Sequence, residues 1–302
     1  MPISMPQFVV AGAARSGTTS LYYYLMQHPG LCMPRKETFY FAREYYGSLP
    51  PGNPPKQRDP SQLILTEDAY GNLFSSCKQQ IAGEISTCYG YLHETAIPLI
   101  RKKLGDVKII FLLRNPADRA WSGYRHFVRL GYETLPFEEA IEEEESRMNT
   151  GWDFMWHYTR LGFYAAQVSA FRSSFSQVMV ICSEEFFEKP HETMRRIFKF
   201  IGVDDSFVPF TGRRYNFSHE DRQSLRYRVL HNPAASLLLK PLARLSLTRN
   251  RRLAWRERLR LPSLAPMPKP GDEVAARLAA LYQSDIENLR TITAMDFSCW
   301  KS

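Results

Sequence analysis

Residues 12–20, with the sequence GAARSGTTS, have the composition of a loop that binds an anion. Gly12 and Gly17 allow a tight turn in which successive backbone N–H groups point toward one anion. Arg15 supplies a positive charge, and a helical pattern that follows the loop would present the positive end of its dipole. Hydroxyl donors follow at Ser16, Thr18, Thr19 and Ser20. The sequence therefore predicts that this loop holds a phosphate-like group.

The spacing of Gly12 and Gly17 matches the nucleotide-binding pattern GxxxxGK[ST], but Thr18 stands where that pattern has lysine. The loop keeps its backbone donors, yet it lacks the cation that neutralises β- and γ-phosphates. No apolar strand is followed by an evident magnesium-binding aspartate. A P-loop kinase or nucleotide triphosphatase is therefore the weaker interpretation, and Arg15 supplies the charge from another position.

A second motif, LLRNPADRAWSGYRHF, places an arginine and a serine where a strand passes into a helix. Arg114 ends the apolar run, Pro116 suits the first helical turn, and Ser122 follows two turns later. A guanidinium fork and a hydroxyl donor together can bind a phosphate. Alone, the pair would suit an ordinary surface, but with the first loop it predicts a second phosphate subsite.

Short apolar runs alternate with helical patterns along most of the chain. The runs of strand length cover residues 7–11, 81–85, 107–113 and 177–182. The helical patterns include residues 95–104, 162–173, 190–201 and about 272–292, and a helix from Pro116. This alternation predicts an α/β fold, a single domain over residues 1–302 with a mainly parallel central sheet flanked by helices. Ligands should gather at the carboxyl ends of the strands.

Three segments depart from this alternation. Residues 47–60 are rich in proline and predict a loop or lid, and residues 137–148 predict a helix with a solvated acidic face. Residues 213–265 predict a basic, helical insert. Over residues 213–260, twelve arginines and one lysine face three acidic residues, so this segment alone carries more than the chain's net charge of +8 and the basicity is regional. Aromatic residues are few there, so nucleic-acid binding is a minor alternative, and contact with the acceptor or a helical cap is expected.

The cysteines and the apolar runs indicate the cellular compartment in which the protein is expected. Five cysteines without CxxC or Cys/His spacing indicate neither a disulfide framework nor a zinc site, and they favour a reducing compartment. The N-terminus lacks a basic start, and the apolar runs are far shorter than the roughly 20 residues of a membrane span. We therefore expect a cytoplasmic protein without a membrane span, and the oligomeric state stays open.

The loop GAARSGTTSL and the unit LLRNPADRAWSGY resemble the two signatures of sulfotransferases that use 3′-phosphoadenosine 5′-phosphosulfate (PAPS). The resemblance includes RKETFYF, GEISTCYGY and the C-terminal YQSDIENL, and it covers most of the chain outside the basic insert. It is closer to the bacterial and glycan-modifying branch. It implies the P-loop-like sulfotransferase fold and metal-free transfer of a sulfuryl group to a hydroxyl or amine of a small-molecule (natural-product) or glycan acceptor, with release of adenosine 3′,5′-bisphosphate (PAP).

The resemblance also assigns the donor-binding residues. Residues 15–20 match the loop that binds the 5′-phosphosulfate, with Arg15 in the place of a usual lysine. Arg114 and Ser122 match the residues that bind the 3′-phosphate. Lys269, in PMPKPGDE, matches a basic loop that closes over the adenosine phosphate, although this stretch also suits a linker.

Three residues are candidates for catalysis. Arg15 is expected to stabilise the leaving phosphate, though arginine is a poorer proton donor than lysine. Glu37 matches the glutamate that takes the acceptor proton in the glycan-modifying branch, while a surface ion pair with Lys36 is the alternative. His93 is the rival base, with a non-catalytic histidine as its alternative. Ile85 departs from the family by replacing a frequent lysine, which places more weight on Arg15.

Overall fold

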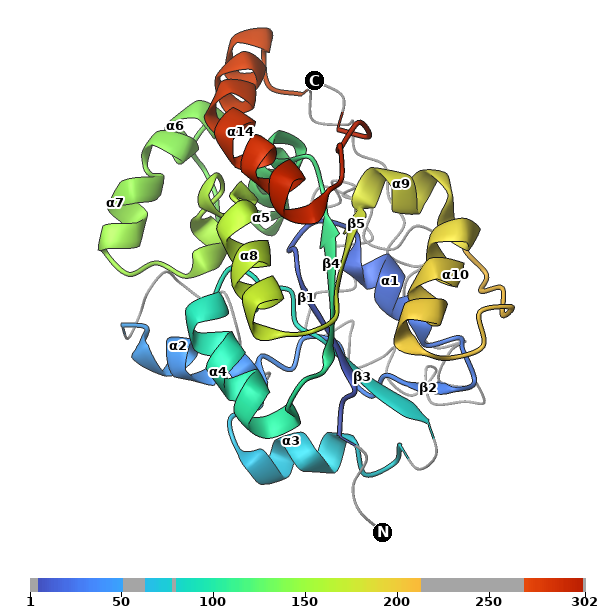
Figure 1. The fold of residues 1–302 in the computed structure, drawn as a ribbon. Coiled ribbons are helices and arrows are strands. Elements are labelled where there is room, and N and C mark those ends of the chain that lie inside the picture. Colours follow the sequence, from blue (N-terminus) through green and yellow to red (C-terminus); the bar gives the residue numbers. More distant parts are fainter. Residues whose placement is uncertain (1–4, 51–62, 78–79, 213–268, 301–302) are drawn as a thin grey trace, which may run out of the picture.

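A single parallel sheet organises the computed structural model, which describes residues 5–50, 63–77, 80–212 and 269–300 (Figure 1). Its order is β2-β3-β1-β4-β5, and every neighbouring pair is parallel. The strands are β1 (Phe8–Gly12), β2 (Leu31–Cys32), β3 (Ile81–Ile85), β4 (Lys108–Leu113) and β5 (Val178–Cys182). The predicted α/β class is confirmed, and the four predicted strands lie within one residue of their expected bounds. The two-residue β2 was not predicted.

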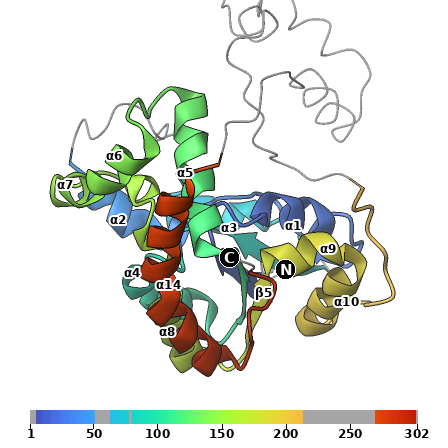
Figure 2. The same ribbon diagram turned by 90° about the horizontal axis from the view of Figure 1, so that it is seen from above.

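Side chains of the strands alternate between two apolar layers, as the pleat of a buried sheet requires. In β1, Val9 and Ala11 pack into one layer, whereas Phe8 and Val10 pack into the other. Figures 1 and 2 show helices on both faces. The first layer is covered by α4 (His93–Leu104), α8 (Ala165–Ser174) and α14 (Asp272–Thr293). The second is covered by α1 (Thr18–Leu25), α9 (Ser183–Glu188) and α10 (Pro190–Ile201).

The remaining helices lie around the sheet. They are α2 (Arg43–Ser48), α3 (Glu67–Leu73), α5 (Pro116–Leu130), α6 (Phe137–Glu142) and α7 (Glu144–Asn149). A third apolar cluster joins α5 and α6 to α14. The predicted helix over 137–148 is therefore two short helices, and the predicted loop over 47–60 begins inside α2. Residues 51–60 of that loop lie outside the residues that the structure describes, as does the whole of the basic insert over 213–265.

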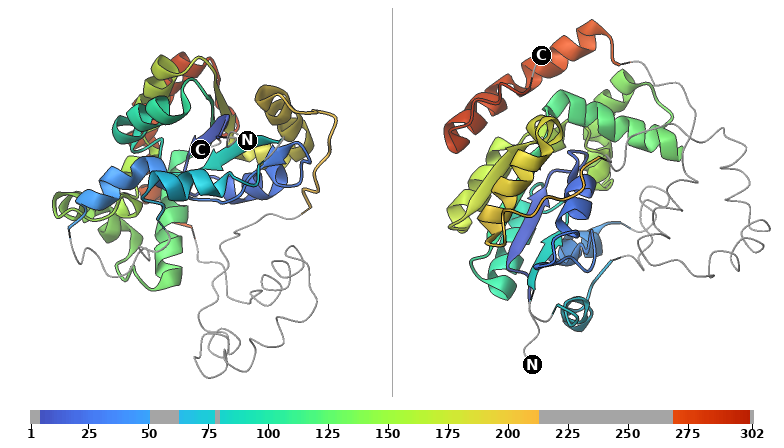
Figure 3. Two further views of the ribbon diagram at one scale, coloured as in Figure 1. Left: turned by 90° about the horizontal axis from the view of Figure 1, so that it is seen from below. Right: turned by 90° about the vertical axis from the view of Figure 1, so that its right-hand side faces the viewer.

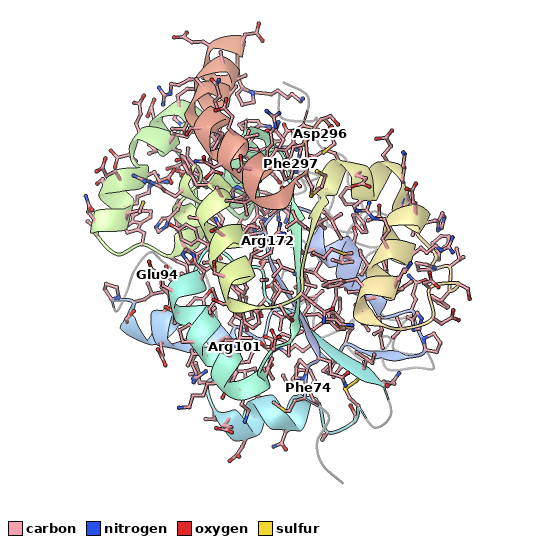
Figure 4. The ribbon with its side chains drawn as sticks, viewed as in Figure 1. Phe74, Glu94, Arg101, Arg172, Asp296 and Phe297 are labelled. Atoms are coloured by element: carbon pink, nitrogen blue, oxygen red, sulfur yellow. A yellow bond between two sulfur atoms is a disulfide. The ribbon has the colours of Figure 1, made fainter. Side chains whose placement is uncertain are left out.

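The C-terminal helix α14 is fixed to α8 at two points. Asp285 accepts hydrogen bonds from the backbone N–H groups of Tyr164 at 2.7 Å and Ala165 at 3.2 Å, which otherwise lack helical partners at the start of α8. Arg172 of α8 donates to Ile292 O at 2.6 Å, and Figure 4 labels this arginine beside the end of α14. These contacts explain why the YQSDIENL segment belongs to the fold although it lies far along the chain.

The strand order creates a switch point between β1 and β4. After β1 the chain moves to β2 and β3 on one side, and after β4 it moves to β5 on the other. Figure 3 shows the same sheet from two further directions. In open parallel sheets, ligands bind outside the carboxyl ends of the strands at such a point. Residues 12–20 follow β1, and Arg114 follows β4, so both predicted phosphate motifs begin at this point.

A disulfide joins Cys32, at the end of β2, to Cys77, which follows α3. Their Cα atoms are 5.6 Å apart, within the usual range for a bridge. The expectation that the cysteines form no disulfide was wrong. The two residues are 45 positions apart, and local spacing cannot reveal such a pairing.

Candidate active site

The loop after β1 turns sharply at Gly17 before α1 begins. Gly17 has φ of 94°, and a Cβ atom there would lie 2.7 Å from the Phe187 ring. Ser16 and Thr18 are buried on either side, and Ser16 Oγ lacks a hydrogen bond of good geometry. Ala13 N donates to Leu112 O at 2.9 Å, which attaches the loop to β4. Glycine is therefore required at position 17, and the loop has the cradle form expected of an anion site.

The two predicted phosphate motifs meet in the structure. Arg15 Nε donates to Ser122 Oγ at 3.4 Å, although 107 positions separate them in the sequence. Arg15 has φ of 70°, a left-handed conformation that is unusual for arginine. Because α5 starts directly after β4, Ser122 lies beside the loop that follows β1.

A group of arginines surrounds Arg15. Burial and then the charges of Arg129, Arg114, Arg119 and Arg125 lower the pKa of Arg15 to about 9. Apart from Arg114, these neighbours lie on α5 at spacings of six and four residues, and the sequence did not assign them a role. Recurrence of basic residues around Ser122 on one helix was the signal that could have found them.

His126 also belongs to this arginine cluster. Arg129 Nη2 donates to His126 Nδ1 at 3.1 Å, so the neutral imidazole carries its proton on Nε2. Burial first, and then Arg15 and Arg129, lower the pKa of His126 to about 3. The side chain is therefore a neutral hydrogen-bond donor at physiological pH, not a further cation.

The backbone around Arg114 is held from two sides. Tyr164 OH donates to Arg114 O at 3.1 Å, and Asn115 N donates to Glu184 Oε1 at 3.0 Å. Glu184 also accepts from Trp300 Nε1 at 2.9 Å, and burial raises its pKa. The C-terminal segment thus helps to fix the turn from which Arg114 emerges.

Glu37 lies at the same edge of the sheet, beyond β3. Thr87 donates to its carboxylate through N to Oε2 and through Oγ1 to Oε1, each at 3.1 Å. Thr87 O would lie 3.8 Å from a Cβ atom on Gly12, where the anion loop starts. Lys36 Nζ is 2.5 Å from Glu37 Oε1, so the ion pair considered from the sequence exists within this arrangement. The structure therefore brings Glu37 to the loop as well as to Lys36.

His93 and Lys269 have less direct connections to the anion loop than Glu37 has. His93 is the first residue of α4, and its Nδ1 donates to Gly90 O at 3.1 Å, so a neutral ring has its lone pair on Nε2. Gly90 N in turn donates to Ala11 O at 2.7 Å, close to the start of the anion loop. Lys269 is exposed just before α14. The structure leaves the roles of both residues as predictions.

Two features are absent from the ranges that the structure describes. No three histidine, cysteine, aspartate or glutamate side chains there form a group that could hold a metal ion. No helix there has the length and apolar character needed to cross a bilayer.

Several characterised proteins are similar to this chain. It is 29% identical over 154 residues to the membrane-associated sulfotransferase kil1 of Dictyostelium discoideum, covering 49% of this chain and 30% of that protein. It is 24% identical over 201 residues to mouse heparan sulfate glucosamine 3-O-sulfotransferase 3B1, covering 66% of this chain and 46% of the relative. The chain thus spans less than half the length of these relatives.

A solved structure and a family model also match this chain. The crystal structure of a sulfotransferase from Alicyclobacillus acidocaldarius matches with a TM-score of 0.76 and 28% identity, over 99% of this chain and all of the other. The model of the sulfotransferase family matches residues 6–207, which include the anion loop, Glu37, Arg114 and Ser122. The chain therefore belongs to the sulfotransferase family.

Proposed function

We propose that this protein transfers a sulfuryl group from PAPS to a hydroxyl or amine of a small-molecule or glycan acceptor and releases PAP. The observation that carries the proposal is the contact of Arg15 with Ser122 within a cluster of arginines. PAPS carries negative charge at its 3′-phosphate and at its 5′-phosphosulfate. Two adjacent anion-binding motifs at one switch point suit a ligand of that kind.

The proposed roles follow from the chemistry of each side chain. The backbone N–H groups of residues 15–20 and the hydroxyls of that loop would hold the 5′-phosphosulfate. Arg114 and Ser122 would hold the 3′-phosphate. Arg15 would stabilise the charge that develops on the leaving phosphate as its bond to sulfur breaks. Arginine retains its proton, so this stabilisation is electrostatic and needs no metal ion.

Glu37 is the base that we favour. In the reaction, the acceptor oxygen or nitrogen bonds to sulfur, the bridging bond from sulfur to phosphate oxygen breaks, and the acceptor proton moves to the base. Thr87 and Lys36 orient the Glu37 carboxylate beside the anion loop, and a general base needs such positioning. His93 is the second candidate because its Nε2 is free of the bond that Nδ1 makes to Gly90.

The class of acceptor and the cellular location are also proposals. Heparan sulfate sulfotransferases are among the similar proteins, which supports a glycan acceptor, while a natural product remains the alternative. A cytoplasmic location stays a prediction, and the Cys32–Cys77 disulfide weighs against a strongly reducing compartment.

A screen of hydroxyl and amine acceptors with radiolabelled PAPS tests this function. Once an acceptor is found, we expect Glu37→Gln to reduce kcat by about 10²-fold or more, as removal of a general base does. His93→Ala should retain most of the activity. A larger loss in His93→Ala than in Glu37→Gln would reverse the assignment of the base, and no transfer to any acceptor class would count against the proposed reaction.

A further inference from the structure

Glu84 is a buried carboxylate that the proposed chemistry does not use. It lies in β3 and is completely buried, and burial raises its pKa. Four hydroxyl groups satisfy it: Oε1 accepts from Thr38, Tyr89 and Ser86, and Oε2 accepts from Tyr70. A buried carboxylate is costly unless such partners satisfy it. The partners therefore show which parts of the chain Glu84 holds together.

Three of these hydroxyl groups also contact residues 37–41, which carry the proposed base. Thr38 is next to Glu37 in the chain and directs its hydroxyl to Glu84. Tyr89 OH lies 2.5 Å from Glu84 Oε1 and accepts from Phe41 N at 3.2 Å. Ser86 Oγ accepts from Phe39 N at 3.1 Å. The carboxylate thus fixes the strap of residues 37–41 through both side chains and backbone.

The strap has a backbone that needs such support. Glu37 has φ of 59° and Phe39 has φ of 58°, and non-glycine residues rarely adopt this left-handed conformation. Glu37 N donates to the backbone oxygen of Ile85 at 2.7 Å, and Ile85 directly follows Glu84 in β3. The two left-handed residues flank Thr38, whose hydroxyl is the point of attachment to Glu84. Because such conformations cost backbone energy, the attachment to Glu84 helps to hold the strap in this form.

We infer that Glu84, through Thr38 and Tyr89, positions the Glu37 carboxylate beside the anion loop. This inference rests on the proposed role of Glu37 as the base. Glu84, Thr38 and Tyr89 are positioning residues, because they act on Glu37 through the strap. Their loss should reduce turnover and leave the donor site intact.

Thr38 gives the sharpest variant. Thr38→Val removes the hydroxyl and keeps the branched shape, whereas Thr38→Ser keeps the hydroxyl. We expect Thr38→Val to lower kcat about 10-fold to 100-fold, the scale of a misplacement of about 1 Å. The Kd for PAP should stay within about twofold of the unchanged protein, and Thr38→Ser should restore most of kcat.

Tyr89 and Tyr70 give a matched pair. Each is a buried tyrosine whose hydroxyl donates to Glu84, but only Tyr89 OH also contacts the strap backbone. Tyr89→Phe and Tyr70→Phe should lower the melting temperature by similar amounts. Only Tyr89→Phe should lower kcat substantially.

The variants are measured for kcat, PAP affinity and melting temperature, and Thr38→Val is also made in the Glu37→Gln background. The inference predicts no further loss of kcat there, because the base is already absent. An equal loss in both backgrounds, or equal losses in Tyr89→Phe and Tyr70→Phe, would overturn it. A crystal structure of Thr38→Val gives a readout that needs no activity. Glu37 still hydrogen-bonded to Thr87 would refute the positioning role, whereas absence of PAP binding would refute the proposed function instead.

Discussion

Arg15 Nε and Ser122 Oγ are 3.4 Å apart, and this contact joins the loop after β1 to the helix after β4. The loop alone could bind any phosphate, and the pair of Arg114 and Ser122 alone would suit an ordinary surface. Together they form one cationic site in which four further arginines lower the pKa of Arg15. The donor-binding residues should therefore act as a unit, and the effects of substitutions there should not simply add.

Removal of the proposed 3′-phosphate ligands should weaken PAP binding. Arg114→Ala loses a charged hydrogen-bonding group worth about 1.5–3 kcal/mol, so the Kd should rise about 10-fold to 100-fold. Ser122→Ala loses a neutral donor and should raise the Kd about fivefold. Isothermal titration calorimetry measures both values. Arg196, an exposed partner of Glu185, is the control, and an equal loss in Arg196→Ala would contradict a specific site.

Gly17 should be indispensable for the anion loop. Gly17→Ala places a Cβ atom 2.7 Å from the Phe187 ring at φ of 94°, so the loop or the ring must shift in addition to the backbone strain. Gly105→Ala is the matched control, since its φ is 76° but nothing lies within 4 Å of the added atom. Both variants should lose about 1–2 kcal/mol of stability from the backbone alone. Only Gly17→Ala should lose PAP binding by 10-fold or more, and retained binding would show that the loop is not the cradle.

The pH dependence of PAP binding should differ between arginine and lysine at position 15. Burial and neighbouring arginines lower the pKa of Arg15 to about 9, so it stays charged at neutral pH. Lysine has an ordinary pKa about two units below that of arginine, and the same environment would remove its charge near neutrality. Arg15→Lys should therefore lose PAP affinity as the pH rises from 6 to 8.5, while the unchanged protein keeps it. Parallel Kd profiles in fluorescence titrations would disprove this electrostatic account.

The Cys32–Cys77 bridge predicts a specific thiol count. Denatured protein without reductant should show three thiols, from Cys88, Cys182 and Cys299, and five after reduction. Replacing Cys32 and Cys77 with serine should lower the free energy of unfolding by about 2–4 kcal/mol, because the bond closes a long loop in the unfolded chain. Ellman's reagent and urea unfolding measure the two effects. Five thiols before reduction would rule out the bridge.

Much of this site could be predicted because its signals are local. The glycine spacing of residues 12–20 and the passage from apolar strand to Arg114 are visible within short windows. The meeting of Arg15 with Ser122 was implied only through the rule that parallel strands end at one edge. The disulfide could not be predicted, because it joins residues 45 positions apart that local spacing does not connect.

The role of the strap also needed the structure. The motif RKETFYF marks Glu37, but the left-handed conformations of Glu37 and Phe39 leave no signature in residue type. Their support comes from Glu84 and Tyr89, far away in sequence. Helical spacing places Arg125 and Arg129 on the same side of α5 as Ser122, so this part of the cluster is predictable from the sequence.

The donor site is tested most directly by the ligand that it binds. PAP should raise the melting temperature of the unchanged protein in a saturable way, because a ligand that binds only the folded state stabilises it. ATP with magnesium should have little effect, and Arg114→Ala should lose most of the PAP response. Stabilisation by ATP with magnesium and none by PAP would contradict the account and favour a kinase or nucleotide triphosphatase.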